Sequence, residues 1–358
     1  MNFLRFNPAV YVIGDEYEIA IALSAFGRVE VQIGNNVFFE ENSGVLPTER
    51  LYAKIRVPQS ILDSFGKYKI LFQKTLERKS YWSTMAEPEA VEYSFKPIDE
   101  NKDINIYYIA DVHYHFEAAK KIASYFGDDT DAYIFNGDIG EVQTADDYLD
   151  VCRLVGEISG GSVPVVFVRG NHDTRGHLPE IYTDYFPANL KDTFFTLKIG
   201  PINAIALDLG EDKADSHTVY GGYNAFHSFR LKEERYLKSL VDQGKNFDLA
   251  ISHIPPSYTA ETHDSVFNIE GELYEKFNKH LCDLGVKAMV SGHWHKAFVL
   301  EKNDKKSLRP HDFPIIVGSV TDDDYIAGAA LTFKKDRLLV KFTDSNHAVL
   351  EEHVIDFK

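Results

Sequence analysis

The sequence predicts an α/β domain preceded by a small all-β sandwich domain. Up to about residue 97 the apolar residues fall in short strand-like runs separated by Gly, Asn, Asp and Pro. From Asn105 onward, apolar runs of strand length alternate with helix-like stretches. The first pattern is typical of a β-sandwich and the second of a sheet covered by helices. We therefore expect a fibronectin- or immunoglobulin-like domain in residues 1–98 and a larger domain in residues 99–358.

Strands in the first domain are expected in the runs PAVYVI, YEIAIAL, VEVQIG, LYAKIRVP, YKILFQKT and AVEYSFKP. Their mixture of apolar and polar residues favours strands that bury one face. The polar stretch KPIDENK, near residues 97–103, contains a proline and is expected to link the two domains.

Buried strands in the second domain are expected in INIYYIAD, AYIFNGD, VPVVFVRGN, INAIALD, FDLAISH and VKAMVSGH. Helices are expected in FEAAKKIASYF, ADDYLDVCRLVGEI, LKEERYLKSLV and GELYEKFNKHLCDLG. Nearly continuous apolar strands that alternate with helices indicate an α/β sheet. After His295 the runs PIIVGSV, GAALTF and RLLVKFT add further strands, which we expect to be largely antiparallel.

Composition limits the class of protein. The 358 residues are 44% hydrophobic, which is enough for one or two cores. Because no apolar run has the length of a membrane helix and the N-terminus lacks a signal-peptide pattern, we expect a cytoplasmic protein without a membrane partner. A formal charge of −17 disfavours nucleic acid as a partner. The two cysteines, Cys152 and Cys282, are far apart in sequence, so a metal site must use oxygen and nitrogen ligands.

Polar side chains follow five of the expected strands, at the point where each strand ends. The carboxyl ends of strands are the usual location of chemistry in α/β domains. Carboxylate and amide oxygens and imidazole nitrogens bind hard to borderline metal ions. The candidate ligands are Asp111, His113, Asp138, Asn171, His253, His293 and His295.

The number of donor side chains indicates two metal ions. One tetrahedral or octahedral ion takes at most about six ligands and usually keeps a water, whereas seven donors are present. If one aspartate bridges the ions, positions remain for a shared hydroxide and a substrate oxygen. Ions about 3.5–4 Å apart polarise a phosphoryl oxygen and lower the pKa of the shared water, so no serine or cysteine nucleophile is needed.

Taken in order, the motifs DVH, GD, GNHD, a histidine after a strand, and GHWH resemble the calcineurin-like metallophosphoesterases. The resemblance covers about residues 104–300. Each motif is short and weak by itself, but five motifs in the right order are a strong signal. It implies two packed mixed sheets with helices outside, which is a four-layer α/β/β/α domain. It also implies hydrolysis of phosphate esters by a metal-bridging hydroxide.

The resemblance implies a role for each ligand. The implied ligands are Asp111, His113 and His295 for one ion, Asn171, His253 and His293 for the other, and Asp138 as the bridge. His115 is a competing donor to His113 at the same strand end.

Three further residues are catalytic or substrate-binding candidates. His172 would protonate the leaving group or bind phosphate, and it is our candidate general acid. Asp173 would orient His172, or would have a structural role at a helix start. Arg169, directly before GNHD, is similar to the arginine that grips phosphate in the serine/threonine phosphoprotein phosphatase branch. The alternative for Arg169 is a surface arginine at a strand end.

A β domain before the metallophosphoesterase domain is similar to the layout of purple acid phosphatases, with two departures. That subfamily places a tyrosine that ligates ferric iron three residues after the GD aspartate, where this chain has Glu141. It lacks a histidine in the first motif, where this chain has His113. We therefore expect two divalent or mixed-valence ions of manganese, iron or zinc, rather than a tyrosinate-bound ferric site.

The predicted function is hydrolysis of a small phosphomonoester. A phosphodiesterase acting on nucleotides or cyclic nucleotides is the alternative, because the same metal chemistry serves both. An alternative of another class is a catalytically silent binding or scaffold module, which the complete ligand set disfavours. Loops at residues 210–230 and 255–268 are expected to shape the substrate pocket. The N-terminal domain would pack beside the cleft or mediate homo-oligomer formation.

Overall fold

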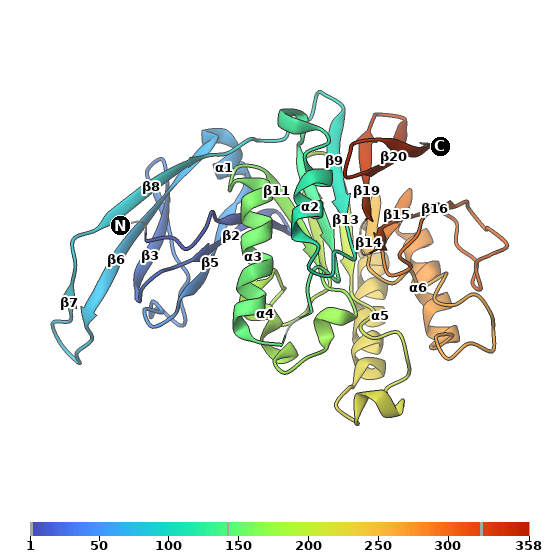
Figure 1. Ribbon diagram of the computed structural model, residues 1–358, viewed down its shortest axis with the longest axis horizontal. Coiled ribbons are helices and arrows are strands. Elements are labelled where there is room, and N and C mark those ends of the chain that lie inside the picture. The colour runs from blue at the N-terminus through green and yellow to red at the C-terminus, as the bar shows by residue number, and fades with distance from the viewer. Residues whose placement is uncertain (1–2, 142, 323–324, 358) are drawn as a thin grey trace.

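The strands of the protein form three sheets in the computed structural model (Figure 1), which describes residues 3–141, 143–322 and 325–357. A single apolar core lies between these sheets and contains side chains from both the N-terminal and the C-terminal parts of the chain. Among the helices that the structure describes, none has the length and apolar character needed to cross a membrane.

The largest sheet has the strand order β21-β20-β19-β9-β10-β11-β1-β2-β5, with β18 paired to β19. Pairing is parallel from β9 through β10 and β11 to β1, and antiparallel at the other contacts. Its strands are β1 (Ala9–Ile13), β2 (Glu16–Ala22), β5 (Tyr52–Pro58), β9 (Ile104–Ile109), β10 (Ala132–Asn136), β11 (Pro164–Val168), β18 (Val320–Asp322), β19 (Tyr325–Phe333), β20 (Arg337–Asp344) and β21 (Val349–Asp356).

The second sheet has the order β12-β13-β14-β15-β17-β16. Its inner strands β13, β14, β15 and β17 are parallel, and β12 and β16 are antiparallel edge strands. Its strands are β12 (Phe195–Ile199), β13 (Ile202–Leu207), β14 (Leu249–Ser252), β15 (Ala288–Ser291), β16 (Ala297–Leu300) and β17 (Ile315–Gly318).

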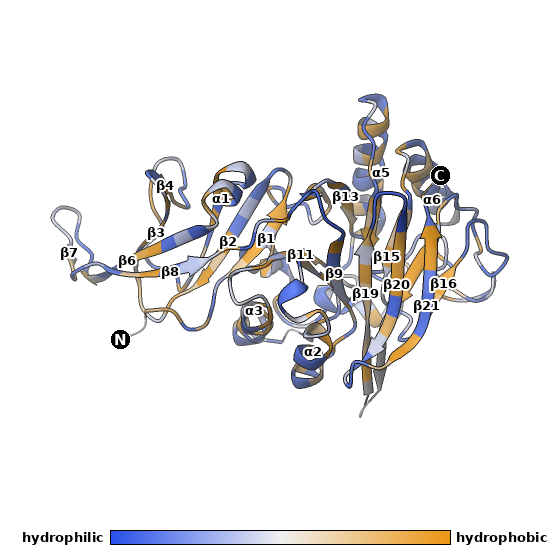
Figure 2. Cartoon of the chain, turned by 90° about the horizontal axis from the view of Figure 1, so that it is seen from above, coloured by the Kyte–Doolittle hydropathy of each residue, from blue (hydrophilic) through white to orange (hydrophobic). Residues whose placement is uncertain are grey.

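Helices cover the outer faces of these two sheets (Figure 2). Ile122 and Val155 belong to one buried apolar cluster with Phe167 of the largest sheet, and Leu237 and Phe277 belong to another with Met289 of the second sheet. The expected four-layer α/β/β/α arrangement is therefore confirmed. The helices are α2 (Phe116–Ala123), α3 (Ala145–Ser159) and the short α4 (Tyr182–Tyr185) on the first side, and α5 (Phe226–Asp242) and α6 (Gly271–Asp283) on the second.

The third sheet lies at the N-terminal end and has the order β4-β3-β6-β7, with β8 also paired to β6. Helix α1 packs beside β6 within the same region. These elements are α1 (Gln59–Phe65), β3 (Gly27–Ile33), β4 (Asn36–Phe38), β6 (Lys67–Glu77), β7 (Thr84–Met85) and β8 (Glu89–Ser94).

The β segment expected in residues 1–98 is present, and part of it is continuous with the largest sheet. Strands β1, β2 and β5 extend the largest sheet, because Val10 of β1 pairs in parallel with Pro164 of β11. The alternation of apolar residues shows that a segment is a strand, but not which sheet it joins. The boundary between residues 98 and 99 stays a prediction as a division between domains.

Each expected strand and helix overlaps an observed element of the same type. The expectations missed α1 and several edge or terminal strands, namely β4, β7, β12, β16 and β21. Edge strands pair on one side only and carry fewer apolar residues, so their pattern in the sequence is weak. The second half of α5 was expected, whereas its first turn, with Phe226, was not.

Replacing Gly156 with alanine tests how closely α3 packs against the segment before β1. In an exposed helix this change stabilises a protein by about 1 kcal/mol. Here the new Cβ would lie 2.1 Å from the main-chain oxygen of Asn7, so we expect the free energy of unfolding to fall by about 1–3 kcal/mol in urea denaturation. Gly271→Ala at the exposed start of α6 is the control, because no atom lies within 4 Å of its added Cβ. Equal stability changes in both variants would contradict this packing.

Candidate metal centre

The strand ends that carry the candidate ligands meet at one place between the two packed sheets. Strands β9, β10 and β11 of the largest sheet end beside strands β14 and β15 of the second sheet. The main-chain N–H of His293 donates to both carboxylate oxygens of Asp111, at 2.8 and 3.1 Å, which ties the two sheets together at this point. The structure brings together Asp111, His113, Asp138, Asn171, His253, His293 and His295.

The innermost group consists of Asp111, Asp138 and His253, whose side chains are all buried. Nε2 of His253 lies 3.1 Å from Oδ2 of Asp138 and 3.7 Å from Oδ1 of Asp111. Despite this proximity, Nε2 makes no well-formed hydrogen bond to any described residue. A buried polar atom without a partner is rare in native proteins and indicates a ligand position.

A second group shares Asp111 with the first and adds His113 and His295, which are more exposed. The Nε2 atoms of the two histidines lie 3.3 Å apart, and Nε2 of His295 lies 3.5 Å from Oδ1 of Asp111. Two nitrogen ligands about 2.1 Å from a tetrahedral ion would be about 3.4 Å apart. The spacing of these donors therefore fits a shared metal ion.

The remaining candidate ligands, Asn171 and His293, contact each other beside the buried group. Oδ1 of Asn171 and Nδ1 of His293 lie 3.0 Å apart, next to the buried ring of His253. Because Nδ1 of His253 donates to the main-chain oxygen of Asn136 at 2.7 Å, its Nε2 is the atom left to bind a cation. Oxygen and imidazole donors, held in place by hydrogen bonds such as that of His253 to Asn136, fit the divalent ions that the family resemblance implies.

The backbone at the site is strained. Aspartate and histidine tolerate a positive φ better than most residues, yet each instance costs of order 1–3 kcal/mol. Such strain persists only where the surrounding structure holds it, and it is concentrated at functional sites. Positive φ angles between 43° and 73° occur at His113, Asp138, His295, Asp111 and His293.

Glycines allow the strand ends to approach each other closely. A Cβ on Gly170 would lie 2.2 Å from Oδ1 of Asp138, and a Cβ on Gly292 would lie 2.6 Å from Oδ2 of Asp111. At Gly137, with φ +80°, a Cβ would lie 2.5 Å from the main chain of Gly170. A glycine therefore directly precedes three of the candidate ligands in the sequence because a larger side chain would not fit there.

The electrostatic field of the buried carboxylates favours positive charge. Burial acts to lower the pKa of His253, but the negative charges of Asp138 and Asp111 overcome it and raise that pKa to about 10. Burial and the neighbouring His253 lower the pKa of His293 to about 4. A metal ion that binds Nε2 of His253 must therefore displace a proton, so metal affinity is expected to decrease at low pH.

His172 lies at the open side of the cluster. Its ring is 4.9 Å from the ring of His113, and its main-chain N–H donates to Oδ1 of Asp138 at 2.8 Å. Nδ1 of His172 lies 3.3 Å from Oε1 of Glu141, and Nε2 lies 3.0 Å from a terminal nitrogen of Arg175. The structure therefore brings the candidate general acid beside the ligands, with a charged group on each ring nitrogen.

Asp173 and Arg169 lie beside the cluster, and each has well-defined partners. The carboxylate of Asp173 accepts hydrogen bonds from the main-chain N–H groups of Gly170 and Asp138, at 2.7 and 3.1 Å. Burial and the charge of Asp138 raise the pKa of Asp173 to about 7. Arg169 pairs with buried Asp208 at 2.6 Å and lies 5.6 Å from the ring centre of Tyr182. The catalytic and phosphate-binding roles of these two residues stay predictions.

Sequence reasoning missed Arg175, which the structure places against His172. Arg175 forms a bidentate ion pair with Glu211, at 2.7 and 2.8 Å, and the Glu211 side chain is 1% exposed. A two-point pair with a buried carboxylate fixes the guanidinium firmly. The only signal in the sequence was the position of Arg175 four residues after the asparagine of GNHD, which by itself does not show where the side chain points. His115 comes directly before α2 and belongs to none of the potential metal groups found among the described residues.

The fold and this cluster agree with a comparison against protein families. The family of calcineurin-like phosphoesterases matches residues 104–297, which is more than half of the chain. The chain therefore belongs to the calcineurin-like phosphoesterase family. This membership supports the expectation of a phosphoesterase enzyme that uses divalent metal ions.

One protein of related sequence provides a further comparison. The serine/threonine-protein phosphatase CPPED1 of Danio rerio is 29% identical over 136 residues, which are 37% of this chain and 42% of that protein. The match thus spans less than half of the length of that relative.

Two solved structures share the fold. Purple acid phosphatase PPD1 from seeds of yellow lupin (Lupinus luteus) has a TM-score of 0.62 at 13% identity, over 98% of this chain and 74% of that chain. PhoD has a TM-score of 0.58 at 10% identity, over 98% of this chain and 88% of that chain. The expected similarity of layout to purple acid phosphatases is confirmed at the level of the fold, and it includes the N-terminal β segment.

Gly292→Ala tests whether the position of Asp111 matters for metal binding. The added Cβ would lie 2.6 Å from Oδ2 of Asp111 and 2.8 Å from Cβ of Ala110, so the carboxylate must move. We expect the affinity for Mn²⁺, measured by calorimetry, to fall by about 10–100-fold, as for loss of other contacts that orient ligands. Gly271→Ala should bind Mn²⁺ like the unchanged protein. Unchanged affinity in Gly292→Ala, with the fold intact, would exclude Asp111 from the metal site.

Proposed function

We propose that the protein hydrolyses phosphate monoesters with two bound metal ions. The observation that carries the proposal is the convergence of two donor groups on the shared, fully buried Asp111, with Nε2 of His253 directed at the same place, 3.1 Å from Asp138. Two buried carboxylates so close together carry negative charge that a bound cation would balance. Small phosphorylated molecules are the proposed substrates.

The proposed assignment of ligands follows the motifs. One ion would be bound at His113 and His295 and the other at Asn171, His253 and His293, with Asp111 in the first set and Asp138 between the two. When bound, such ions polarise a phosphoryl oxygen and activate a water molecule for attack on phosphorus. Manganese, iron and zinc are the candidate metals, because the donor set combines oxygen and imidazole and contains no thiolate.

His172 would assist the leaving group, and Arg175 would bind the phosphate. Because a guanidinium group only donates, Nε2 of His172 accepts from Arg175 in the present arrangement, and the ring proton stands on Nδ1 facing Glu141. For Nε2 to deliver a proton, it must first take up one from solvent, and the terminal nitrogen of Arg175 must donate to a substrate oxygen instead of to His172, while the pair with Glu211 holds the guanidinium in place. A doubly charged phosphate monoester offers the oxygen atoms that attract it.

The preference for monoesters over diesters has two supports. A cationic Arg175 beside His172 matches the extra negative charge of a terminal phosphate. In addition, the relatives from Danio rerio and yellow lupin are both named as phosphatases.

Metal-stripped protein titrated with Mn²⁺, Fe²⁺, Zn²⁺ or Mg²⁺ tests the proposal. We expect hydrolysis of p-nitrophenyl phosphate to reach its maximum at about two equivalents of metal and to exceed that of bis(p-nitrophenyl) phosphate. Asp138→Asn, which keeps the shape of the side chain but removes its charge, should lose turnover by orders of magnitude. A faster reaction with the diester would select the diesterase alternative. Failure to bind any metal would contradict the proposal as a whole.

His172→Ala separates the two roles proposed for this histidine. We expect metal content to stay unchanged and kcat to fall by about 10²–10⁴-fold with phenyl phosphate, whose poor leaving group needs a proton. The loss with p-nitrophenyl phosphate should be smaller, because that leaving group departs without protonation. His115→Ala is the matched control and should react normally. An equal loss with both esters would show that His172 binds phosphate instead.

A further inference from the structure

A cavity of about 970 Å³ opens beside His172, and Thr174 and Arg175 form the wall nearest to it. Arg175 contacts Nε2 of His172 at 3.0 Å, so this cavity and the candidate general acid share a wall. Pockets for small organic ligands measure about 300–1,000 Å³, and a phosphate group alone needs far less. The cavity therefore has room for the organic part of a substrate on the side where a leaving group would depart.

Four aromatic side chains line this cavity, from Tyr220 to Phe229. Phe226 and Phe229 lie three positions apart in the first turn of α5, so they occupy the same face of that helix, and both are half-buried. The Arg169 guanidinium lies 5.8 and 5.6 Å from their ring centres. Cation–π contact of this kind restrains the rings. Tyr223 is 93% exposed and stands at the cavity rim.

The charged end of the cavity has its own ion pair, and further contacts connect it to the aromatic end. Arg175 is paired with buried Glu211, and the Tyr220 hydroxyl donates to the same carboxylate at 3.0 Å. Arg230, which is fully buried, donates to the main-chain oxygens of Leu209, at 2.7 Å, and of Glu211. The loop that carries Glu211 is thus anchored to α5, the helix that also supplies the two phenylalanines. One rigid unit presents both a phosphate-binding charge and aromatic ring faces.

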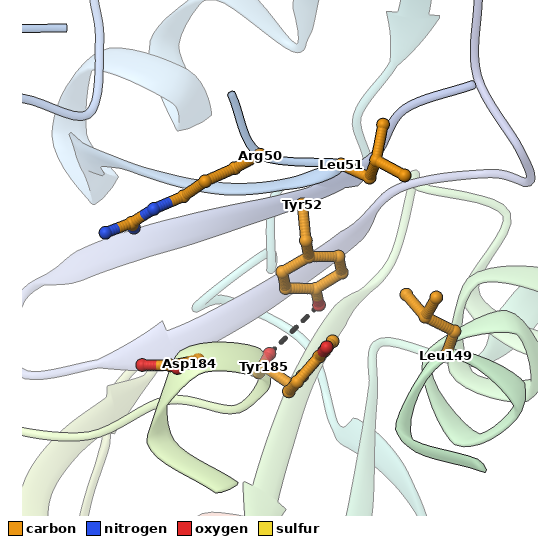
Figure 3. A pocket seen from close by; sticks show the side chains of 6 residues that line it. All are labelled: Arg50, Leu51, Tyr52, Leu149, Asp184 and Tyr185. Carbon is orange, nitrogen blue, oxygen red and sulfur yellow. Dashed lines mark hydrogen bonds between the residues drawn. The ribbon is translucent and has the colours of Figure 1, made fainter. Parts of the chain in front are cut away.

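A second cavity provides a contrast (Figure 3). Its volume is about 280 Å³, and the Tyr52 hydroxyl inside it already donates to the main-chain oxygen of Tyr185 at 2.9 Å. None of the residues that line it is a candidate ligand or catalytic residue. Of these two cavities, the one beside His172 is the one that adjoins the candidate site.

Resting on the function proposed above, we propose that this cavity binds the organic part of the substrate, and that the substrate is a phosphate ester that carries a planar aromatic ring. Stacked or edge-to-face contacts between rings contribute about 0.5–1.5 kcal/mol beyond burial alone. If the ring of the substrate were bound at Tyr223 and Phe229, its phosphate group would point toward Arg175 and His172. Both an aryl phosphate and a nucleotide have this chemistry, and they differ in the distance between ring and phosphorus.

The test compares substrates within each variant, so that intrinsic leaving-group reactivity cancels. The metal-loaded protein is assayed for kcat/KM with phenyl phosphate, adenosine 5′-monophosphate and propyl phosphate. In Tyr223→Ala and in Phe229→Leu we expect the ratio of an aromatic ester to propyl phosphate to fall by about 3–10-fold. A fall with phenyl phosphate identifies aryl esters, and a fall with adenosine 5′-monophosphate identifies nucleotides. Because Tyr223 is exposed, its variant keeps the fold even where Phe229→Leu does not.

Tyr81→Ala is the matched control, because Tyr81 is 77% exposed in the turn between β6 and β7, at the opposite end of the molecule (Figure 1). Ratios that stay within about twofold of the unchanged protein, or an equal fall in Tyr81→Ala, would overturn the inference.

A binding measurement separates this inference from the proposed function. Calorimetry on the metal-loaded protein should show tighter binding of phenylphosphonate than of methylphosphonate, by about 3–10-fold, and Tyr223→Ala should abolish the difference. Absence of hydrolysis with every ester would contradict the proposed function, while this preference would still support the aromatic cavity. Equal binding of the two phosphonates, or binding of neither, would overturn the inference of an aromatic substrate.

Discussion

The burial of two carboxylates where two sheets meet is the constraint on which the rest of the site depends. Asp111 and Asp138 are almost completely excluded from solvent. A buried carboxylate is stable only when donors or cations surround it. Main-chain N–H groups of His293 and His172 supply such donors at 2.8 Å, from turns that are far apart in sequence. The turns therefore have to converge, and the histidines they carry converge with them.

This convergence explains the unusual backbone. Five candidate ligands have a positive φ, and three glycines leave no space for a side chain between the strand ends. Such strain lowers stability, and it is retained because the two packed sheets hold the strand ends in place from both sides. The cores under α2 and α3 and under α5 and α6 supply that rigidity. The candidate metal centre is thus a property of the whole four-layer fold rather than of a single loop.

The constraint extends from the carboxylates toward the cavity beside His172. Asp138 holds the main chain of His172, His172 contacts Arg175, and Arg175 is fixed by Glu211. Buried Arg230 connects the Glu211 loop to α5. These contacts join one element to the next, so packing sets the distance from the candidate metal ligands to the aromatic wall.

The sequence by itself determined the class of enzyme and the order of the elements. The identities of Asp111, His253 and the other candidate ligands were readable because each follows a strongly apolar strand, and a strand end is a local feature. Tertiary structure alone decided which sheet β1 joins, because strand pairing is long-range. It also decided that Arg169 pairs with Asp208 while Arg175 reaches His172. Both arginines lie near GNHD in the sequence, and only packing directs a long flexible side chain to one partner.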